Sequence, residues 1–196
     1  ARVLAALAPG DTEVRALIAL MEFQSSRFAT RTDAGGLPVL LADQNRSRWD
    51  RSAIVRGRAA LDHARRGESG LGYYGLQAAI AEVHSTAPTF ADTDWALIVR
   101  LYDALLRLAP SPVVRLNRAV AVSMADTPES ALPLVDELDG ELAGFRPYHA
   151  VRAELLERVG RTADAVAAFE RAASLPGNAA EAIALRRRAA LLRDES

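Results

Sequence analysis

The sequence predicts an all-α protein built from antiparallel helical hairpins. Half of its residues are hydrophobic but only 6% are aromatic, and alanine and leucine dominate, which favours helices that meet through small side chains over a sheet-rich fold. Small and large apolar residues recur with a period of about 34 residues in the C-terminal half. In the same half, Ser111-Pro112 and Thr127-Pro128 combine an N-cap residue with a proline in the first helical turn.

The recurring residues have the types and spacing of a tetratricopeptide (TPR) hairpin, in which small residues let two helices approach closely. One copy has its glycine, small, aromatic and small positions at Gly160, Ala165, Phe169 and Ala172. The copy before it fills the last three positions with Ala131, Val135 and Leu138. A more degenerate copy contains Ile98, Tyr102, Leu105 and Pro110. We therefore expect a TPR-like right-handed solenoid over residues 93–196.

The N-terminal part, residues 1–92, predicts helices of irregular length. Residues 2–8 read as the end of a helix, and Asp11 or Thr12 caps a second helix that runs to Phe28 and includes Phe28 in its apolar stripe. Residues 30–43 lose the helical period, so we expect a short irregular or β-hairpin-like segment there.

The remaining helices follow from turn signals and caps. Glycines after residue 66, Pro88, and a cap at Asp92 or Thr93 separate the helices of the N-terminal part from the repeats. The expected helices span residues 52–66, 73–86, 94–108, 112–124, 128–138, 146–158, 162–174 and 178–192. No long linker interrupts them, so we expect one continuous structural unit.

Composition and charge exclude several classes of protein. A formal net charge of −1 gives no overall attraction to nucleic acid or to a membrane surface. The chain has no cysteine, and it has no apolar run of about 18 residues and no signal peptide, so we expect a cytoplasmic protein without membrane contact. It opens without methionine in a helical pattern, which suggests a part of a longer protein. Its basic residues are all arginine, a bias that a GC-rich genome produces without any functional demand.

The densest polar cluster is Asp43-Gln44-Asn45-Arg46-Ser47-Arg48-Trp49-Asp50, at the start of the helix expected over residues 52–66. Two interpretations stay open. Trp49, with Arg46 and Arg48 beside it, can contact a partner, because aromatic and guanidinium groups contribute most to binding interfaces. Alternatively, Trp49 fills the core while Arg46 and Asp50 form local caps and ion pairs.

Charge is unevenly distributed along the chain. Between Arg46 and Arg66 arginines outnumber aspartates, whereas residues 126–144 hold only acidic charges. The basic stretch can touch phosphates or an acidic protein face, and the acidic stretch can contact a basic partner. Both are also compatible with solvated helix faces.

The sequence contains no specific signature of catalysis. Tyr73, Gln77 and His84 share one helix and can line a pocket, although helical aromatics more commonly pack in a core. The three histidines lie far apart without metal-ligand spacing, and no phosphate-binding glycine loop or nucleophile elbow is present. We expect no enzyme activity, catalytic residue, metal or cofactor.

Asn117 and Arg118 fall on the inner helix of their hairpin, which lines the binding groove in TPR proteins. Such side chains can hold a peptide backbone or carboxylate. A hydrogen bond to a neighbouring helix is the equally weighted alternative.

Together, residues 40–50, 75–84, 92–95, 101–106 and 110–121 resemble the C-terminal extension of one group of extracytoplasmic-function (ECF) RNA polymerase sigma factors. The resemblance covers essentially the whole chain. The residues that it makes the best candidates for contacts are chiefly 43–50 and Asn117-Arg118. In that family, sigma regions two and four precede a TPR-like extension.

The resemblance implies a bacterial transcription initiation factor whose extension regulates promoter-directed activity. The implied partners are sigma regions two and four of the same protein, the RNA polymerase core, and a regulatory protein or small ligand. DNA contact would come only from the sigma regions, which these residues do not include. The candidate interaction residues are Asp43, Gln44, Arg46, Arg48, Trp49, Asp50, Tyr73, Gln77, His84, Asn117 and Arg118. The alternative function is a free-standing TPR-type adaptor that binds peptides.

Overall fold

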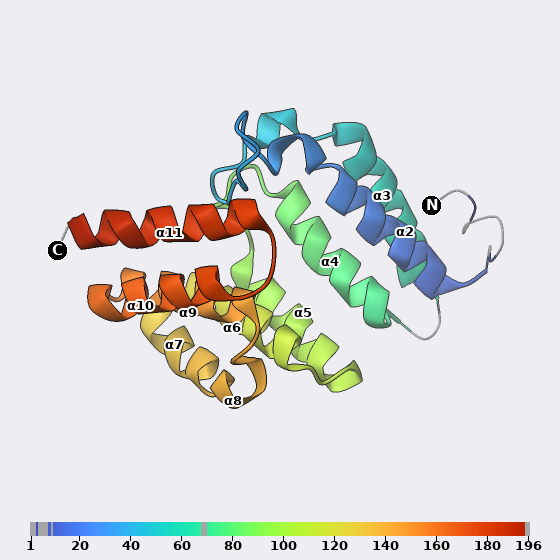
Figure 1. The fold of residues 1–196 in the computed structure, drawn as a ribbon. Coiled ribbons are helices and arrows are strands. Elements are labelled where there is room, and N and C mark those ends of the chain that lie inside the picture. The colour runs from blue at the N-terminus through green and yellow to red at the C-terminus, as the bar shows by residue number, and fades with distance from the viewer. Residues whose placement is uncertain (1–2, 4–7, 9, 68–69, 195–196) are drawn as a thin grey trace. The chain divides into compact units, whose positions relative to one another are not determined.

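The computed structural model describes residues 3, 8, 10–67 and 70–194, and this part of the chain is all-helical (Figure 1). It contains ten α-helices, two short 3-10 helices and no β-strand. The helix expected over residues 2–8 lies outside the described residues except for Val3 and Ala8. Within the described ranges, no helix combines the length and the apolar character needed to cross a bilayer.

The chain divides into two compact units. Unit 1 consists of residues 1–33 and 39–110, and unit 2 of residues 34–38 and 111–196. The boundary expected from the sequence lies at residue 92. The sequence therefore assigns the helix over residues 95–108 to the C-terminal repeats, whereas the structure assigns it to unit 1. That helix belongs to unit 1, where it packs against the preceding helix.

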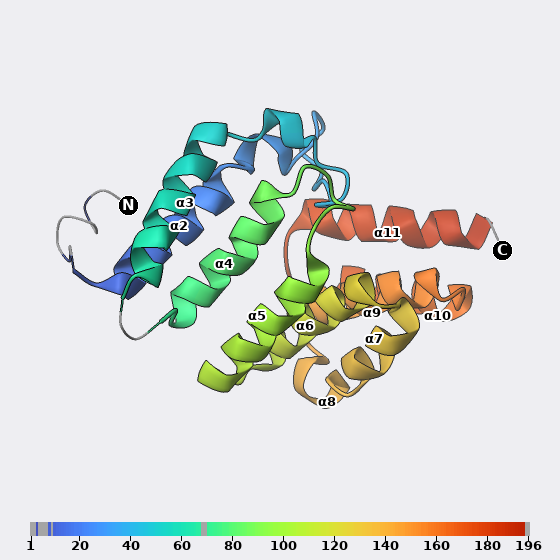
Figure 2. The same cartoon turned by 180° about the vertical axis from the view of Figure 1, so that it is seen from behind.

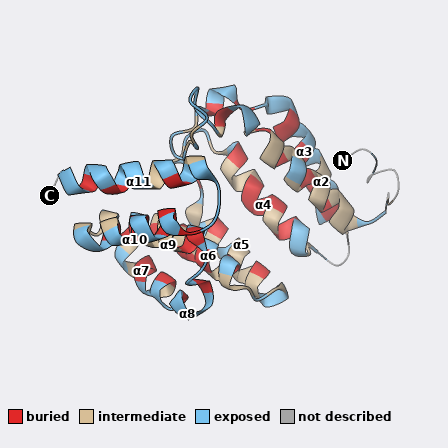
Figure 3. Ribbon diagram, viewed as in Figure 1, coloured by how far each residue is buried: buried red, intermediate tan, exposed pale blue. Residues whose placement is uncertain are grey.

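Unit 1 is formed by three helices that lie side by side and a fourth that packs on one of them. Its helices are α2 (Thr12–Ser25), α3 (Arg51–Arg65), α4 (Tyr73–Thr86) and α5 (Trp95–Leu108), with the 3-10 helices η1 (Phe28–Thr30) and η2 (Arg46–Arg48) between α2 and α3. Both ribbon views show α2 and α3 beside α4 (Figures 1 and 2). Because α4 also contacts α5, it is buried on more than one side (Figure 3).

Small residues and one buried aromatic ring allow the close packing in unit 1. Ala16 and Ala19 of α2 are fully buried, as is Phe23. Opposite Phe23, a Cβ atom placed on Gly57 would lie only 2.8 Å from the ring carbon Cε1. The glycine in α3 is therefore the position at which α2 can bring this ring against the α3 backbone.

The start of α4 is fixed by a side chain from another helix. The Glu13 carboxylate of α2 accepts hydrogen bonds from the backbone N–H of Tyr74 at 2.9 Å and of Gly75 at 3.3 Å. Amide groups in the first turn of a helix lack intrahelical partners and carry partial positive charge. Glu13 therefore acts as the N-terminal cap of α4, where Gly72 has no side chain to do so.

Of the two forms that the sequence allows for residues 30–43, the β-hairpin-like one is wrong and the irregular one is correct. A backbone hydrogen bond joins Val39 N–H to Arg31 O at 2.9 Å, but a β-hairpin needs a series of such bonds between two strands, and neither side of this turn is a strand. The physical reason is local: Pro38 has no N–H to donate, and Gly36, with φ of 77°, turns the chain tightly.

Unit 2 consists of helices that pack mainly against their sequence neighbours. They are α6 (Pro112–Ala125), α7 (Pro128–Asp136), the short α8 (Asp139–Leu142), α9 (Arg146–Arg158), α10 (Thr162–Ser174) and α11 (Ala179–Asp194). The packed pairs are α6 with α7, α7 with α9, α9 with α10, and α10 with α11. The small and large residues of both repeats are buried, namely Ala131, Val135, Leu138, Ala165, Phe169 and Ala172.

The turn between α9 and α10 has the geometry that the repeat pattern requires of a glycine. Gly160 has φ of 76°, and its N–H donates to Glu157 O at 3.0 Å. The N–H of Arg161 donates to Leu156 O at 2.9 Å. These two bonds form a Schellman C-cap, in which a left-handed residue satisfies the last carbonyls of the helix.

Candidate interaction surface

The polar cluster over residues 43–50 is organised around a buried arginine stacked on a buried tryptophan. Arg46 is only 8% exposed, and its Cζ lies 4.6 Å from the centre of the Trp49 ring. Its Nη1 donates to the backbone oxygens of His84, at 2.5 Å, and Ala87, at 3.0 Å. Arg46 therefore closes the C-terminal end of α4, where carbonyl groups lack helical partners.

Trp49 fills the core of unit 1, and its neighbours hold the connecting segment in place. The Trp49 ring is 3% exposed, and its Nε1 donates to Thr30 Oγ1 at 3.0 Å. Gln44 Nε2 donates to Val39 O at 3.1 Å. Asp50 is the N-cap of α3. Of the two interpretations of Trp49, the structure therefore supports core packing over partner contact.

Three guanidinium groups gather near this tryptophan. Arg27 and Arg31 both donate to Gln24 Oε1, at 2.8 and 2.5 Å, and Arg27 Cζ lies 6.0 Å from the Trp49 ring centre. Burial, followed by the charges of Arg31 and Arg46, lowers the pKa of Arg27 to about 10. Burial also lowers the pKa of Arg46, which the charge of Asp92 partly offsets. Arg27 still carries its charge at neutral pH.

His84 is inside this positive environment and is neutral at physiological pH. Burial, with smaller contributions from Arg27 and Arg46, lowers the pKa of His84 to about 4. Its ring packs against Trp95 with centroids 5.1 Å apart. Tyr73, 42% exposed, lies at the other end of α4, about 16 Å away at about 1.5 Å of rise per residue. Tyr73, Gln77 and His84 therefore do not converge on one pocket.

Five residues of the segment between α2 and α3 form what we call the loop surface: Phe28, Leu40, Asp43 and Arg48, which are exposed, and Arg31, which is half-buried. Phe28 is 63% exposed and Leu40 is 59% exposed. Arg31 Cζ lies 5.1 Å from the Phe28 ring centre. The loop surface thus combines exposed apolar side chains with charges on a segment that Trp49 ties to the core.

Three members of the loop surface, Phe28, Arg31 and Leu40, were not candidates from the sequence. Phe28 was assigned to the apolar stripe of a helix, but α2 ends at Ser25 and the chain turns into η1 before the ring. The paired serines Ser25 and Ser26, whose hydroxyls donate to Glu22 O and Phe23 O, were the signal that the helix ends early. Leu40 carried no signal of exposure.

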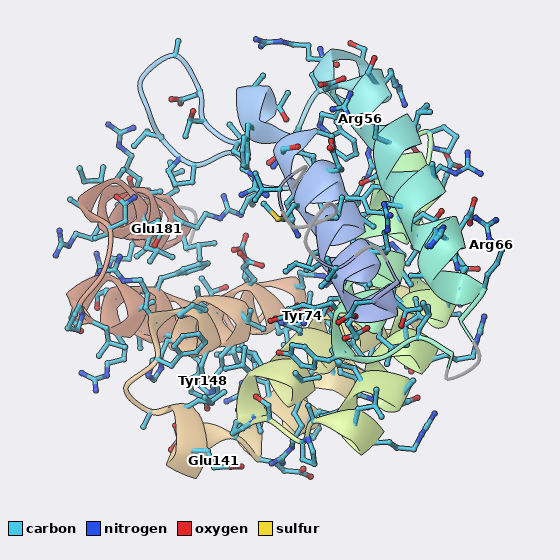
Figure 4. The ribbon with its side chains drawn as sticks, turned by 90° about the vertical axis from the view of Figure 1, so that its right-hand side faces the viewer. Arg56, Arg66, Tyr74, Glu141, Tyr148 and Glu181 are labelled. Carbon is cyan, nitrogen blue, oxygen red and sulfur yellow. The ribbon has the colours of Figure 1, made fainter. Side chains whose placement is uncertain are left out.

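The basic stretch of α3 is partly neutralised within unit 1. Arg56 pairs with Glu22 at 2.8 Å, and Arg65 pairs with Glu82 at 2.6 Å. Figure 4 shows Arg56 beside the first half of α3 and Arg66 at its end. Arg58 also lies 3.6 Å from Glu82. Since these three arginines of α3 already face carboxylates, the excess of arginine counted in the sequence overstates the positive field of this face.

The candidates of unit 2 are separated from the loop surface in the sequence and lie in different surroundings. Asn117 is exposed and Arg118 half-buried on α6. In the acidic stretch, Asp136 accepts from Arg152 Nε at 2.7 Å and Glu141 from Arg115 Nη1 at 2.7 Å. This stretch is therefore also partly neutralised by basic residues outside it.

Tyr148 connects α9 to the acidic stretch. Its ring is 1% exposed, and its hydroxyl donates to Asp139 Oδ1 at 3.2 Å. Burial and the neighbouring Asp139 charge raise the pKa of Tyr148 to about 12. Figure 4 shows Tyr148 and Glu141 in this part of unit 2. The phenol therefore stays protonated and serves as a core residue with one polar contact.

Comparisons with known proteins find a family model and a relative to which the chain is similar. Residues 1–65 match a family described as "Family of unknown function (DUF6596)". This match includes α2, the loop surface and the whole of α3. The chain is also 46% identical over 185 residues to an uncharacterized protein of Rhizobium meliloti (strain 1021). That alignment covers 94% of this chain and 44% of the relative, so the chain spans less than half of the relative's length. No solved structure matches the chain.

Proposed function

We propose that this chain is a regulatory protein-interaction module of an ECF-type RNA polymerase sigma factor. In this proposal it modulates transcription initiation by contacting sigma regions two and four of the same protein or the RNA polymerase core. The support begins with the sequence, because residues 40–50 and 110–121 carry the motifs of the sigma-factor extension. The relative from Rhizobium meliloti has more than half of its length outside the matched region, which is room for other domains in that protein.

The observation that carries the proposal is the loop surface, part of which belongs to the cluster over residues 43–50 that the resemblance includes. Buried Trp49 and Arg46 fix the backbone of this segment, while Phe28 and Leu40 remain largely exposed. Exposed apolar side chains flanked by arginine are typical of protein-binding sites. A preformed surface also limits the entropy that is lost on binding.

The second element of the proposal is that unit 2 is a TPR-like right-handed solenoid that supports these contacts. Its helices pack against their neighbours in sequence, and the repeat positions Ala131 and Ala165 are both fully buried. Repeat modules of this kind present extended faces to protein partners. Asn117, exposed on α6, is a candidate contact residue in this unit.

The test uses a full-length factor, in which sigma regions precede this chain, with core polymerase and a promoter template. Phe28→Ser and Leu40→Ser together are expected to change promoter-specific transcript yield by about fivefold or more, in line with the loss of two exposed interface side chains. Val55→Ser is the matched control, because Val55 is 65% exposed in the same unit but lies on α3.

Two outcomes would contradict the proposal. Unchanged transcription by the Phe28/Leu40 variant would exclude the loop surface as the contact. Unchanged transcription after deletion of the whole chain, in vitro and in cells, would exclude the regulatory function itself. An absence of sigma-like helices before this chain in the complete gene would instead favour the free-standing peptide adaptor.

A further inference from the structure

A shallow groove of about 550 Å³ lies between α7 and the turn that joins α9 to α10 in unit 2. Its apolar lining consists of Leu132 and Pro133 of α7 and Val159 at the end of α9. Figure 1 shows α7 beside α9 in this unit. The volume is in the range of sites that accept a few side chains of a ligand.

Acidic side chains border this apolar lining, and they are unequally neutralised. Asp136 is paired with Arg152 at 2.7 Å. Glu137 is 3.9 Å from Arg115, which lies closer to Glu141. Glu129, on the first turn of α7, is exposed and makes no ion pair with any residue that the structure describes.

The cationic group at the groove is already engaged. Arg161 lines one side, but both its Nε and Nη2 bind Asp164, at 2.8 and 2.7 Å. The groove therefore keeps an excess of negative charge, and Glu129 contributes a full carboxylate without a local counter-ion. An apolar floor with this charge pattern complements a ligand that has an apolar side chain next to a cationic one.

We propose that this groove binds a short segment of a partner protein in which a leucine-like side chain alternates with arginine or lysine. The apolar side chain lies against Leu132, Pro133 and Val159, and the cation faces Glu129. This proposal is independent of the loop surface in unit 1 and of the sigma-factor function, because its residues all belong to unit 2.

The test measures fluorescence anisotropy of a labelled hexapeptide, Arg-Leu-Arg-Leu-Arg-Leu, titrated with the full chain. The Glu129→Arg variant is expected to weaken binding by about fivefold or more, because it replaces an attraction by a repulsion. Asp126→Arg is the matched control: it makes the same charge change at an exposed acidic residue that does not line the groove, and is expected to stay within about twofold.

A second peptide tests the apolar contact without altering the protein. Arg-Ser-Arg-Ser-Arg-Ser has the same charge, and we expect it to bind about fivefold more weakly because it cannot bury a leucine side chain. Far-UV circular dichroism of each variant confirms that the helices are retained, so that weaker binding reports the groove.

The proposal is overturned if Asp126→Arg weakens binding as much as Glu129→Arg, because attraction is then non-specific. It is also overturned if the serine peptide binds as well as the leucine peptide, or if neither binds at about 1 mM protein. Sedimentation experiments in which the chain self-associates and Glu129→Arg abolishes the association would identify a second copy as the occupant instead.

Discussion

Replacing Arg46 with alanine is expected to destabilise unit 1 by about 3 kcal/mol, mainly through lost hydrogen bonds to a helix end. The guanidinium donates to His84 O at 2.5 Å and Ala87 O at 3.0 Å, and it covers the face of Trp49. Each hydrogen bond from a charged group contributes about 1.5–3 kcal/mol, and a cation–π contact about 0.5–2 kcal/mol. We take the lower part of these ranges because Nη2 of Arg46 is buried without a partner, and the substitution also removes the desolvation cost of that group.

Urea unfolding followed by tryptophan fluorescence measures this effect for unit 1 alone, because both tryptophans of the chain, Trp49 and Trp95, belong to that unit. Arg48→Ala is the matched control, since Arg48 is exposed on the same 3-10 helix and should change stability by no more than about 0.5 kcal/mol. Arg46→Lys is expected to fall between the two, because one ammonium group keeps the charge but cannot stack as a plane. If Arg46→Ala is as stable as Arg48→Ala, the assignment of Arg46 as the cap of α4 is wrong.

Two further predictions concern pH and backbone conformation. Because the pKa of His84 is about 4 in the folded chain and about 6.5 when unfolded, the unfolded state takes up the proton first as pH falls. The free energy of unfolding of unit 1 should therefore drop by about 2 kcal/mol between pH 7 and pH 5, as measured by urea unfolding with fluorescence detection. His84→Gln should remove most of that drop. If the variant and the unchanged protein show the same pH dependence, His84 is not the group that causes it. In unit 2, Gly160→Ala should cost about 1 kcal/mol in thermal unfolding followed by far-UV circular dichroism, because φ is 76° with no atom within 4 Å of the added Cβ. Gly144→Ala, where φ is not positive and space is also free, should be nearly neutral, and similar losses at both glycines would refute the strain argument.

The sequence predicts the helices well because the capping residues, prolines and glycines from which they were predicted are themselves the physical causes of helix ends. Residues 73–86, 146–158 and 162–174 are helical with the predicted bounds. Asp11 caps α2, accepting from Glu13 N–H at 2.8 Å, as one of the two proposed residues. The start of α5 differs slightly, because Asp94 rather than Asp92 or Thr93 accepts from the helical N–H of Leu97. Any of these short polar residues can cap a helix, so residue type alone does not decide between them.

The candidate site was less predictable because its contacts join distant parts of the chain. Arg46 donates a hydrogen bond to the backbone oxygen of His84, and Trp49 donates one to the hydroxyl of Thr30. The sequence identifies the cluster over residues 43–50 as unusual, but it does not show which side chains turn inward. The structure buries Arg46 and Trp49 and leaves Asp43 and Arg48 exposed. Burial of this kind depends on tertiary contacts rather than on residue type.

Arginine has a structural role in this chain that its bulk composition did not indicate. Other arginines also bind carbonyl groups at helix ends. Arg146 donates to Leu175 O and Asn178 O beyond α10, and Arg158 donates to Ser123 O at 3.0 Å near the end of α6. A guanidinium can serve two acceptors from separate nitrogens in a fixed plane, which one ammonium group does not reproduce. Figure 4 labels Glu181, whose carboxylate lies 3.5 Å from Arg146 Nη1 and partly balances its charge.

This role separates stability from function in the proposed module. Arg46 fixes the segment that carries the loop surface but is itself buried, so its loss should alter transcription only to the extent that unit 1 unfolds. Phe28 is mostly exposed and contributes little to the core, so its loss should alter transcription at unchanged stability. A contact residue must change transcript yield without changing the urea midpoint of unit 1. If transcript yield instead followed the urea midpoint in the Arg46 and the Phe28 variants alike, the loop surface would not be a contact, and both variants would act on transcription only by destabilising unit 1.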